Sequence, residues 1–518
     1  MIFSEIADKN EYEILIGSES SLMNFEVLGL SYDSRVEGEN KIFCATYGAG
    51  SDANEYLNKA VDNNYKVLVS DQSLEDLISK YQLDQKLFED NDATLIKVKD
   101  VNEALALFAE RLNDFPSKQI KLVGVTGTNG KTTITMLIHN TLKELGHKCG
   151  LIGTMEIHYD DEVETSKNTT PDAVKLQEVY RKMVDKGCEY NVMEVSSHSL
   201  SLKRVCHEEF EVGVYTNLTE DHLDFHGSME NYRDAKLILF EKAKKCVLNA
   251  DTEYSDFYIE KCKEMNKEIM LYSIADNFDG KATSFEDKYG NVNCLVASNL
   301  DISIMGSEFD VTYKNGDTLQ KERVKVRTPG VFSVYNALST IGSLLELGYE
   351  LKTVLEVLKT LPGITGRFQT FTSKKGFGVA VDYAHTPDGL VNILNTAKSF
   401  VKGRIITVFG CGGDRDKLKR PIMGKIVMEL SDVTIVTSDN PRTEDPEKII
   451  EDIEVGMKDL GKDYLKISDR YEATKKAIEL ANEGDFVIIA GKGHEDYQII
   501  GKEKIHFSDI ENVTKLID

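Results

Sequence analysis

The chain has 518 residues, of which 41% are hydrophobic and 29% are charged, and this composition is typical of a folded, soluble protein. That length exceeds what one hydrophobic core supports, so we expect about two to four domains. The formal net charge of −25 argues against nucleic acid as a general partner, because phosphate backbones are bound by clustered lysine and arginine.

The N-terminal sequence MIFSEIADKNEYEI lacks a basic region followed by an apolar one, so it does not resemble a signal peptide. No apolar run approaches the ~20 residues that span a membrane, and we therefore expect no membrane partner. The eight cysteines form no C-x-x-C pair, and none has a histidine at metal-binding spacing. We expect reduced, structural thiols in the cytoplasm.

Apolar runs typical of buried strands recur along the chain, and most of them end in polar sequence. Two lie near the N-terminus, at 41–47 and 65–71. The runs that end in chemically reactive residues lie at 120–125, 190–195, 211–218, 377–381, 404–410, 432–438 and 485–491. Helical patterns separate them, for example at 131–145 and 470–483. Continuous apolar strands that alternate with helices predict an α/β fold with a parallel sheet, in which ligands bind beyond the carboxyl ends of the strands.

Three domains are predicted from the positions of these elements. Residues 1–116 hold the first two strands and end in the polar sequence LNDFPSKQ. Residues 117–362 begin with the strand at 120–125, and residues 363–518 open at the turn LPGITG. The sequence at 250–330 is polar, and we expect irregular structure there.

The stretch GVTGTNGKTT, residues 124–133, departs from the common phosphate-loop pattern G-x-x-x-x-G-K-[ST], because Val125 stands where the first glycine belongs. The strand before it and the helix after it still indicate a phosphate site, since glycines free the backbone N–H groups and the helix N-terminus faces the anion. Lys131 can reach the β- and γ-phosphates, and the Thr132 hydroxyl is placed to bind Mg²⁺. The alternative is a glycine-rich turn with an incidental lysine.

Further candidate residues follow the phosphate loop. Glu194 ends a predicted strand, either as a second magnesium ligand or as the cap of the next helix. The loop NLTEDHLDFHG gathers Asn217, Asp221, His222 and His226, which favours a functional cluster over a structural one. Lys236 lies in a helical pattern, where it reads as a solvated lysine or a phosphate contact.

These motifs together resemble those of the Mur ligases. They occur in the order of that family as GVTGTNGKTT, MEVSSH, NLTEDHLDFHG, YRDAKLILF, GRF, DYAHTPD, GCGGDRDKLKRPIM, DNPR and GKGHEDYQ. The resemblance covers nearly the whole chain, including DSRVEGENKIF near the N-terminus. It implies a three-domain α/β architecture: an N-terminal UDP-MurNAc-binding domain, a central ATP-binding domain with a P-loop-type parallel sheet, and a C-terminal Rossmann-like domain that binds the amino acid.

The resemblance also implies an activity. An ATP-dependent ligase of this kind adds meso-diaminopimelate to UDP-MurNAc-L-Ala-D-Glu through an acyl phosphate, in peptidoglycan precursor synthesis. It implies ATP as a substrate, Mg²⁺, a carbamate derived from CO₂, small-molecule partners only, and a monomer in the cytoplasm.

Site residues are implied position by position. The catalytic residues are Lys131, Glu194, His222 and Lys236, and the metal ligands are Thr132, Glu194, His222 and carbamylated Lys236. The ATP contacts are Thr126, Gly127, Thr128, Asn129, Gly130, Lys131, Thr132, Asn336, Arg367 and Asp382. The contacts to UDP-MurNAc-dipeptide are Ser34, Arg35, Thr169, Thr170, Ser196 and Arg204. The contacts to diaminopimelate are Arg415, Asp439, Asn440, Pro441, Arg442, Gly491 and Glu495.

The DNPR motif predicts which amino acid is taken. Diaminopimelate carries one more carboxylate than lysine, and a guanidinium grips a carboxylate by two parallel hydrogen bonds. Arg442 would therefore select diaminopimelate and repel the ammonium of lysine, while Glu495 would pair with the distal amino group. The alternative for Arg442 is a solvated arginine paired with Glu444 or Asp445. Arg415 would hold another carboxylate, or Asp414 and Asp416 would neutralise it.

Three positions depart from the usual family pattern. Ser333 and Gln369 loosen the assignment of ATP contacts, and Leu202 loosens one contact to the substrate. Competing interpretations are a ligase of the same family that adds lysine or another amino acid, a folylpolyglutamate synthetase, and a non-catalytic nucleotide-binding module on this fold.

Overall fold

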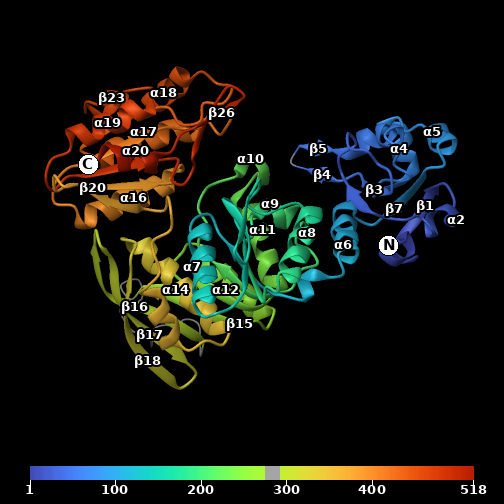
Figure 1. The fold of residues 1–518 in the computed structure, drawn as a ribbon, viewed down its shortest axis with the longest axis horizontal. Coiled ribbons are helices and arrows are strands. Elements are labelled where there is room, and N and C mark those ends of the chain that lie inside the picture. Colours follow the sequence, from blue (N-terminus) through green and yellow to red (C-terminus); the bar gives the residue numbers. More distant parts are fainter. Residues whose placement is uncertain (49, 275–291, 518) are drawn as a thin grey trace. The chain divides into compact units, whose positions relative to one another are not determined.

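The computed structural model describes residues 1–48, 50–274 and 292–517 (Figure 1). The chain forms two compact units. The first contains Met1–Leu248 and Thr252–Met270, and the second contains Asn249–Asp251 and Leu271–Asp518. In the part of the chain that the structure describes, every helix falls short of the length or the apolarity needed to cross a lipid bilayer.

The first unit begins with a five-stranded sheet in the order β1-β7-β6-β3-β2. Its strands are β1 Tyr12–Ile16, β2 Gly29–Ser31, β3 Lys41–Cys44, β6 Val67–Ser70 and β7 Thr94–Val98. Around it lie α1 Phe3–Ile6, α2 Glu19–Met23, the pair β4 Tyr47–Gly48 and β5 Ser51–Asp52, η1 Ala53–Tyr56, α3 Leu57–Asp62, α4 Leu74–Tyr81, α5 Gln85–Asp90 and α6 Val101–Leu112. Ile42 packs in one hydrophobic cluster and its neighbour Phe43 in the other. Successive strand residues point to opposite faces, so burial on both faces explains the continuous apolar run of this strand.

A second sheet of the first unit carries the phosphate loop. Its strands follow the order β11-β10-β9-β12-β8-β13-β14, and β9, β12, β8, β13 and β14 are parallel. They are β8 Lys121–Thr126, β9 Cys149–Ile152, β10 Glu156–Tyr159, β11 Glu162–Thr165, β12 Tyr190–Glu194, β13 Phe210–Tyr215 and β14 Ala243–Asn249. The connecting elements are η2 Pro116–Lys118, α7 Lys131–Glu144, α8 Ala173–Asp185, α9 Ser197–Ser201, α10 Leu223–His226, α11 Met229–Lys242 and α12 Ser255–Glu264. Parallel strands bring the chain segments that follow β8, β9, β12 and β13 to one edge of the sheet.

The prediction of irregular structure at 250–330 is wrong for the residues that the structure describes. This range contains α12, β15 Glu268–Ile274 and an antiparallel meander of β16 Asn293–Ser303, β17 Gly306–Asn315 and β18 Thr318–Val326. Residues 275–291 of the range lie outside the described residues. In β17 the buried and the more exposed residues alternate, as in a sheet with one solvated face, so its polar residues belong to a regular strand.

The second unit continues with α14 Val331–Glu346 and α15 Leu351–Leu358 and ends in a six-stranded sheet, drawn in orange and red in Figure 1. The strands are β19 Gln369–Thr372, β20 Gly378–Asp382, β21 Ile405–Phe409, β22 Val433–Val436, β23 Leu465–Lys466 and β24 Phe486–Ala490, in the order β19-β20-β24-β21-β22-β23. The other elements are α16 Pro387–Phe400, α17 Lys419–Leu430, α18 Pro446–Glu454, η4 Lys458–Leu460, α19 Arg470–Leu480, the hairpin β25 Tyr497–Ile500 and β26 Glu503–His506, and α20 Asp509–Leu516. All pairs except β19–β20 are parallel.

The predicted fold class is confirmed. The seven apolar runs that end in reactive sequence form β8, β12, β13, β20, β21, β22 and β24, and every one lies in a parallel arrangement. The boundaries between the three predicted domains stay a prediction.

Candidate active site

The phosphate loop joins β8 to α7 in a conformation that its glycines make possible. Gly127 has a φ of 148°, and a side chain there would meet Thr216 Oγ1 at 1.9 Å. Gly130 has a φ of 89° and precedes the first turn of α7. Asn217 ties the loop down, because its carbonyl oxygen accepts from Thr128 N and its Oδ1 from Asn129 N, both at 2.9 Å. The N-terminus of α7 therefore meets a fixed loop, which is the arrangement that binds a phosphate.

Two lysines converge on one carbonyl oxygen of this loop. Lys131 Nζ donates to Gly127 O and to Thr128 O, both at 2.8 Å. Lys236, from α11, also donates to Gly127 O, at 3.0 Å, and is 1% exposed. Burial, and then the charge of Lys131, hold the pKa of Lys236 well below its usual range. The interpretation of Lys236 as a solvated lysine is therefore wrong.

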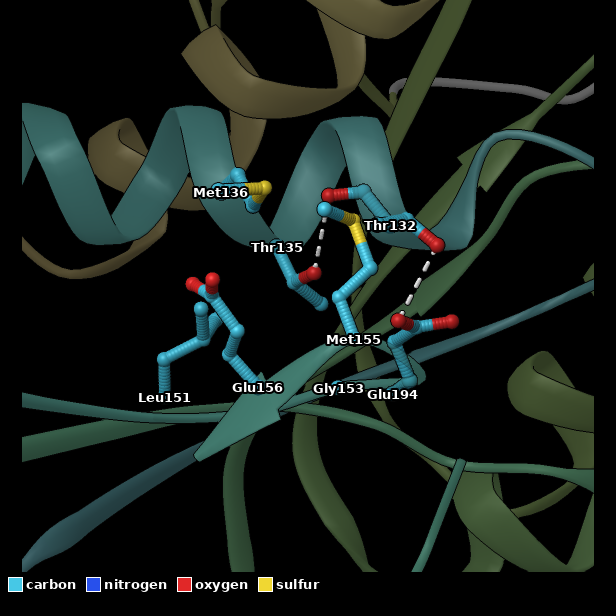
Figure 2. A pocket seen from close by; sticks show the side chains of 8 residues that line it. All are labelled: Thr132, Thr135, Met136, Leu151, Gly153, Met155, Glu156 and Glu194. Carbon is cyan, nitrogen blue, oxygen red and sulfur yellow. Dashed lines mark hydrogen bonds between the residues drawn. The ribbon is translucent and has the colours of Figure 1, made fainter. Parts of the chain in front are cut away.

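Glu194 lies buried at the end of β12, and Figure 2 shows its carboxylate facing the Thr132 hydroxyl. Oε1 accepts from Thr132 Oγ1 at 3.0 Å and from Thr154 N at 2.8 Å, and Oε2 accepts from Thr154 Oγ1 at 3.1 Å. Gly153 leaves room for this carboxylate, since a side chain there would lie 2.9 Å from Oε1. The capping alternative for Glu194 is wrong, because the Ser196 hydroxyl caps α9 by accepting from Ser199 N.

A small hollow opens beside Thr132 and Glu194 (Figure 2). Its other lining residues are Thr135, Met136, Leu151, Gly153, Met155 and Glu156. It has room for about one water molecule.

Hydroxyl and carboxylate oxygens are the ligands that Mg²⁺ prefers, and Thr132 Oγ1 and Glu194 Oε1 are 3.0 Å apart. This pair therefore fits the expected metal. Among residues 1–48, 50–274 and 292–517, no three His, Cys, Asp or Glu side chains lie close enough together to hold a metal by themselves. The structure thus brings two of the four predicted ligands together, while His222 and Lys236 make other contacts.

In the loop after β13, His222 and His226 make different contacts. His222, with a φ of 54°, lies 3.4 Å from Asp221 Oδ2 through Nε2. Burial lowers the pKa of His222, and Asp221 opposes that shift. The ring of His198 lies 4.9 Å from that of His222. His226 turns inward instead, where Nε2 lies 2.9 Å from Ser197 Oγ, so it has a structural contact.

The residues predicted to bind UDP-MurNAc-dipeptide fall into two groups within the first unit. Ser34 is buried, while Arg35 is exposed and pairs with Asp33, which lowers the pKa of Asp33 to about 2. The second group forms a chain of hydrogen bonds that ends at Glu194. Its links are Arg204 to Thr170 O at 3.0 Å, Thr170 Oγ1 to Glu194 O at 2.8 Å, Thr170 Oγ1 to Ser196 Oγ at 3.3 Å, and Thr169 Oγ1 to Thr154 Oγ1 at 3.0 Å.

Three predicted ATP contacts lie in the second unit. Asn336 is buried in α14, and the guanidinium of Arg367 lies 4.6 Å from the centre of the Tyr383 ring. Both carboxylate oxygens of Asp382 accept from backbone N–H groups, of Phe368 and Ala384, each at 2.6 Å. Asp382 therefore shapes the backbone at the end of β20, and burial raises its pKa.

The departures from the family pattern have local partners. Gln369 Oε1 accepts from Gly366 N at 3.0 Å, and Ser333 Oγ donates to Pro329 O at 2.9 Å. Leu202 uses its carbonyl oxygen to accept from Asn102 Nδ2 at 3.3 Å.

The DNPR loop follows β22 and packs against the loops after β21 and β24. Arg442 donates through NH1 to Gly413 O at 2.7 Å. Glu444 pairs with Arg420 at 2.8 Å, so the alternative of an Arg442–Glu444 pair is not the arrangement found. Asp445 accepts from Glu447 N, so its side chain caps the N-terminus of α18.

The remaining residues predicted to bind diaminopimelate surround this loop. Pro441 packs so closely on Gly413 that a side chain there would meet Pro441 O at 1.9 Å. Gly491 has a φ of 121° beside the Asp439 carboxylate. Arg415 is exposed and donates to Asp414 O at 3.3 Å. The Asp414 carboxylate accepts from Thr443, and Asp416 accepts from Leu418 N, so these two acids bond to other groups.

Two residues beside these candidate sites, the half-buried Thr154 and the buried Lys492, are absent from the sequence predictions. Thr154 binds both oxygens of Glu194 after β9, and Lys492 lies among Asp439, Asn440 and Glu495 after β24. Each follows a parallel strand, so the rule that ligands bind at the carboxyl ends of strands would have found them.

Comparisons with known proteins agree with this geometry. The model of the Mur ligase middle domain matches residues 125–344, and that of the Mur ligase glutamate ligase domain matches residues 366–493. A Clostridium botulinum protein is 44% identical, covering 95% of each chain, and one from Clostridium tetani is 41% identical, covering 100% of this chain and 99% of its own. Both are named UDP-N-acetylmuramoyl-L-alanyl-D-glutamate–2,6-diaminopimelate ligase.

Solved structures give the same picture. A structure of a ligase with that name has a TM-score of 0.67 and 30% identity, and covers 100% of this chain and 99% of its own. A folylpolyglutamate synthase from Mycobacterium tuberculosis has a TM-score of 0.57 at 14% identity, and covers 74% of this chain and 91% of its own. At that identity the second likeness concerns the fold alone.

Proposed function

This chain belongs to the Mur ligase family, and from that premise we propose how its residues carry out the family's reaction. It is an ATP-dependent ligase that adds 2,6-diaminopimelate to UDP-N-acetylmuramoyl-L-alanyl-D-glutamate in the synthesis of peptidoglycan precursors. The observation that carries the proposal is the buried Glu194 carboxylate hydrogen-bonded to the Thr132 hydroxyl beside a lysine-bearing phosphate loop.

The proposed reaction has two steps. The γ-phosphoryl group of ATP passes to the free carboxylate of the glutamate side chain, which gives an acyl phosphate and ADP. The amine of diaminopimelate then attacks the acyl carbon, the amine loses a proton, and inorganic phosphate leaves as the peptide bond forms. Both steps depend on positioning and on charge neutralisation more than on covalent chemistry by the protein.

The phosphate loop supplies the neutralisation in this proposal. Lys131 exchanges its contacts with Gly127 O and Thr128 O for the β- and γ-phosphates, and the N-terminus of α7 adds its N–H groups. Thr132 and Glu194 would hold Mg²⁺, which when bound offsets negative charge on the phosphates. His222 and Lys236 would complete the metal ligands once nucleotide is present.

We propose that Lys236 is carbamylated in the active enzyme. Burial and Lys131 lower the pKa of its amine well below the usual range, which favours the neutral form that attacks CO₂, and the product is a carbamate and one released proton. The change places an anion beside Lys131, which forms an opposite-charge contact and provides oxygen ligands. Electron density for a carbamate in a nucleotide complex tests this, and a plain lysine that turns away from the nucleotide would refute it.

The dipeptide nucleotide and the amino acid are proposed to bind at two different places. The hydrogen-bonded chain Arg204–Thr170–Glu194 supports a site for UDP-MurNAc-dipeptide near the phosphate loop, with Ser34, Arg35, Thr169 and Ser196 as further contacts. The loops after β22 and β24 would hold diaminopimelate through Asp439, Asn440, Arg442 and Glu495, together with Arg415, Pro441 and Gly491. Asn336, Arg367 and Asp382 are proposed for ATP, and we propose that the enzyme works as a monomer in the cytoplasm.

One assay tests the function. Phosphate release is measured with ATP and Mg²⁺, with and without UDP-MurNAc-L-Ala-D-Glu, and with meso-diaminopimelate and L-lysine side by side. Release that needs both the dipeptide nucleotide and diaminopimelate is expected. Release with lysine would identify a different amino acid specificity, release with a folate and glutamate would identify a folylpolyglutamate synthetase, and ATP binding without release would identify a non-catalytic module.

A further inference from the structure

Lys492 lies in the loop after β24 with its side chain fully buried. A buried ammonium is costly unless its charge is paired and its three N–H groups have acceptors. Its Nζ lies 2.8 Å from Tyr497 O, 2.9 Å from Asn440 Oδ1 and 3.1 Å from Asp439 Oδ1. Tyr497 O and Asn440 Oδ1 accept hydrogen bonds from the ammonium, and Asp439 pairs with its charge, so the ammonium is committed to the protein and not to a ligand.

The same ammonium sets the direction of the Asn440 amide. Asn440 Oδ1 accepts from Lys492 Nζ and, at 3.0 Å, from Ile499 N. The amide nitrogen must therefore face the other way, where Nδ2 donates to Glu495 Oε2 at 2.9 Å. A reversed amide would direct its oxygen at that carboxylate, so the contact with Lys492 selects the orientation in which Asn440 holds Glu495.

The Lys492 ammonium also lies close to two carboxylates, those of Asp439 and Glu495. Its Nζ lies 3.5 Å from Glu495 Oε2, in addition to its pair with Asp439. Burial, and then Asp439, raise the pKa of Glu495, while Lys492 lowers it. For Asp439, burial raises the pKa, but Lys492 and Arg470 outweigh it and the net shift is downward. The other titratable or charged groups that interact with this pair are Tyr383, His385, Arg470 and Tyr497, while Arg367 acts on Tyr383 and Arg442 acts on Tyr497.

We propose that Lys492 is a positioning residue of the amino-acid pocket: it holds the Asn440 amide and the Glu495 carboxylate in the arrangement that receives the distal ammonium group of diaminopimelate, without touching the amino acid. The inference rests on the proposed function of the loops after β22 and β24. Under this proposal, loss of Lys492 changes the charge state of Glu495 and therefore the pH dependence of amino-acid binding.

The test compares Lys492→Met with Lys504→Met. Lys504 is the matched control, because it is exposed and its Nζ lies 3.7 Å from the centre of the Tyr497 ring. In Lys492→Met we expect KM for diaminopimelate to rise roughly tenfold or more, with KM for ATP within about twofold of wild type. An unpaired Glu495 protonates more readily, so the acidic limb of kcat/KM for diaminopimelate should move up by about one pH unit.

Lys492→Arg keeps the charge, and its acidic limb should stay near that of wild type. Lys504→Met should change neither KM nor the limb. The proposal is overturned if Lys492→Met keeps the wild-type limb and KM for diaminopimelate, or if the KM values for diaminopimelate and ATP rise alike while kcat and the melting temperature fall, with no shift of the limb.

A crystal structure of the wild-type enzyme with bound diaminopimelate decides the question even if the variants do not fold. We expect Lys492 Nζ to keep its contact with Asn440 Oδ1, and a direct contact between this ammonium and the amino acid would overturn the proposal. Failure of the proposed function has a different signature, namely phosphate release by the wild-type enzyme with L-lysine in place of diaminopimelate. The same KM and pH comparisons, made with the amino acid that is used, then still decide the role of Lys492.

Discussion

Replacement of Arg442 tests the choice of amino acid most directly. Its guanidinium is half-buried and already donates through NH1 to Gly413 O, which fixes the side chain between the loops after β21 and β22. A guanidinium held in this way is pre-ordered for a carboxylate, so little side-chain entropy is lost when diaminopimelate binds. The prediction is that Arg442→Ala mainly weakens the reaction with diaminopimelate.

The magnitude of the loss follows from the two hydrogen bonds that the Arg442 guanidinium is expected to donate to the second carboxylate of diaminopimelate. A charge-assisted hydrogen bond contributes about 1.5 kcal/mol or more, so two of them amount to about 3 kcal/mol. That loss lowers kcat/KM for diaminopimelate roughly 10²-fold. The reaction with L-lysine should not fall, because lysine lacks the second carboxylate.

The assay is amino-acid-dependent phosphate release with both amino acids at saturating ATP and UDP-MurNAc-dipeptide. Arg442→Gln is the matched variant, since a glutamine amide can still donate to Gly413 O but carries no charge. It separates the loss of the loop contact from the loss of the carboxylate partner. Equal losses with diaminopimelate and lysine, or a wild-type kcat/KM that is comparable for the two, would refute the reasoning.

Three further predictions concern the first unit. Lys131→Ala should abolish nearly all phosphate release, by roughly 10³-fold or more, because a cation aimed at the transferring phosphoryl group is lost, and a variant with near-normal turnover contradicts that role. Lys236→Ala should be almost inactive, and added short carboxylates should restore part of the activity by taking the place of the carbamate, whereas an active variant without added acid excludes a carbamate. Burial raises the pKa of Glu208 from its usual 4.5 to about 8, so the stability that its neutral form provides is fully present below pH 4.5 and is lost as pH rises from there to about 8. Glu208→Gln should therefore raise the melting temperature more at pH 9 than at pH 5, in a scan of thermal unfolding against pH, because its amide cannot ionise and still lies beside Gln177. An equal change at both pH values contradicts the assignment.

The sequence alone determined the strands that carry the site. Five-residue apolar runs such as β12 and β24 are buried on both faces, so they read as strands without knowledge of their partners. The reactive residues after them were located for the same reason, because parallel strands present their carboxyl ends at one edge. The solvated faces of β16 to β18 gave no such signal, and those strands were not predicted.

Only the tertiary structure decided which polar groups share a partner. Lys236 lies 109 residues from Gly127 in the chain, yet both it and Lys131 donate to the same carbonyl oxygen. Ser196 and not Glu194 caps α9, which leaves the Glu194 carboxylate to Thr132 and Thr154. The strand rule reaches the position of Lys492 after β24, but only the folded chain shows that its ammonium is buried beside Asp439 and Asn440 of another loop. Burial and hydrogen bonding join groups that sequence spacing does not relate, and they set the charge of each side chain, so these assignments required the folded chain.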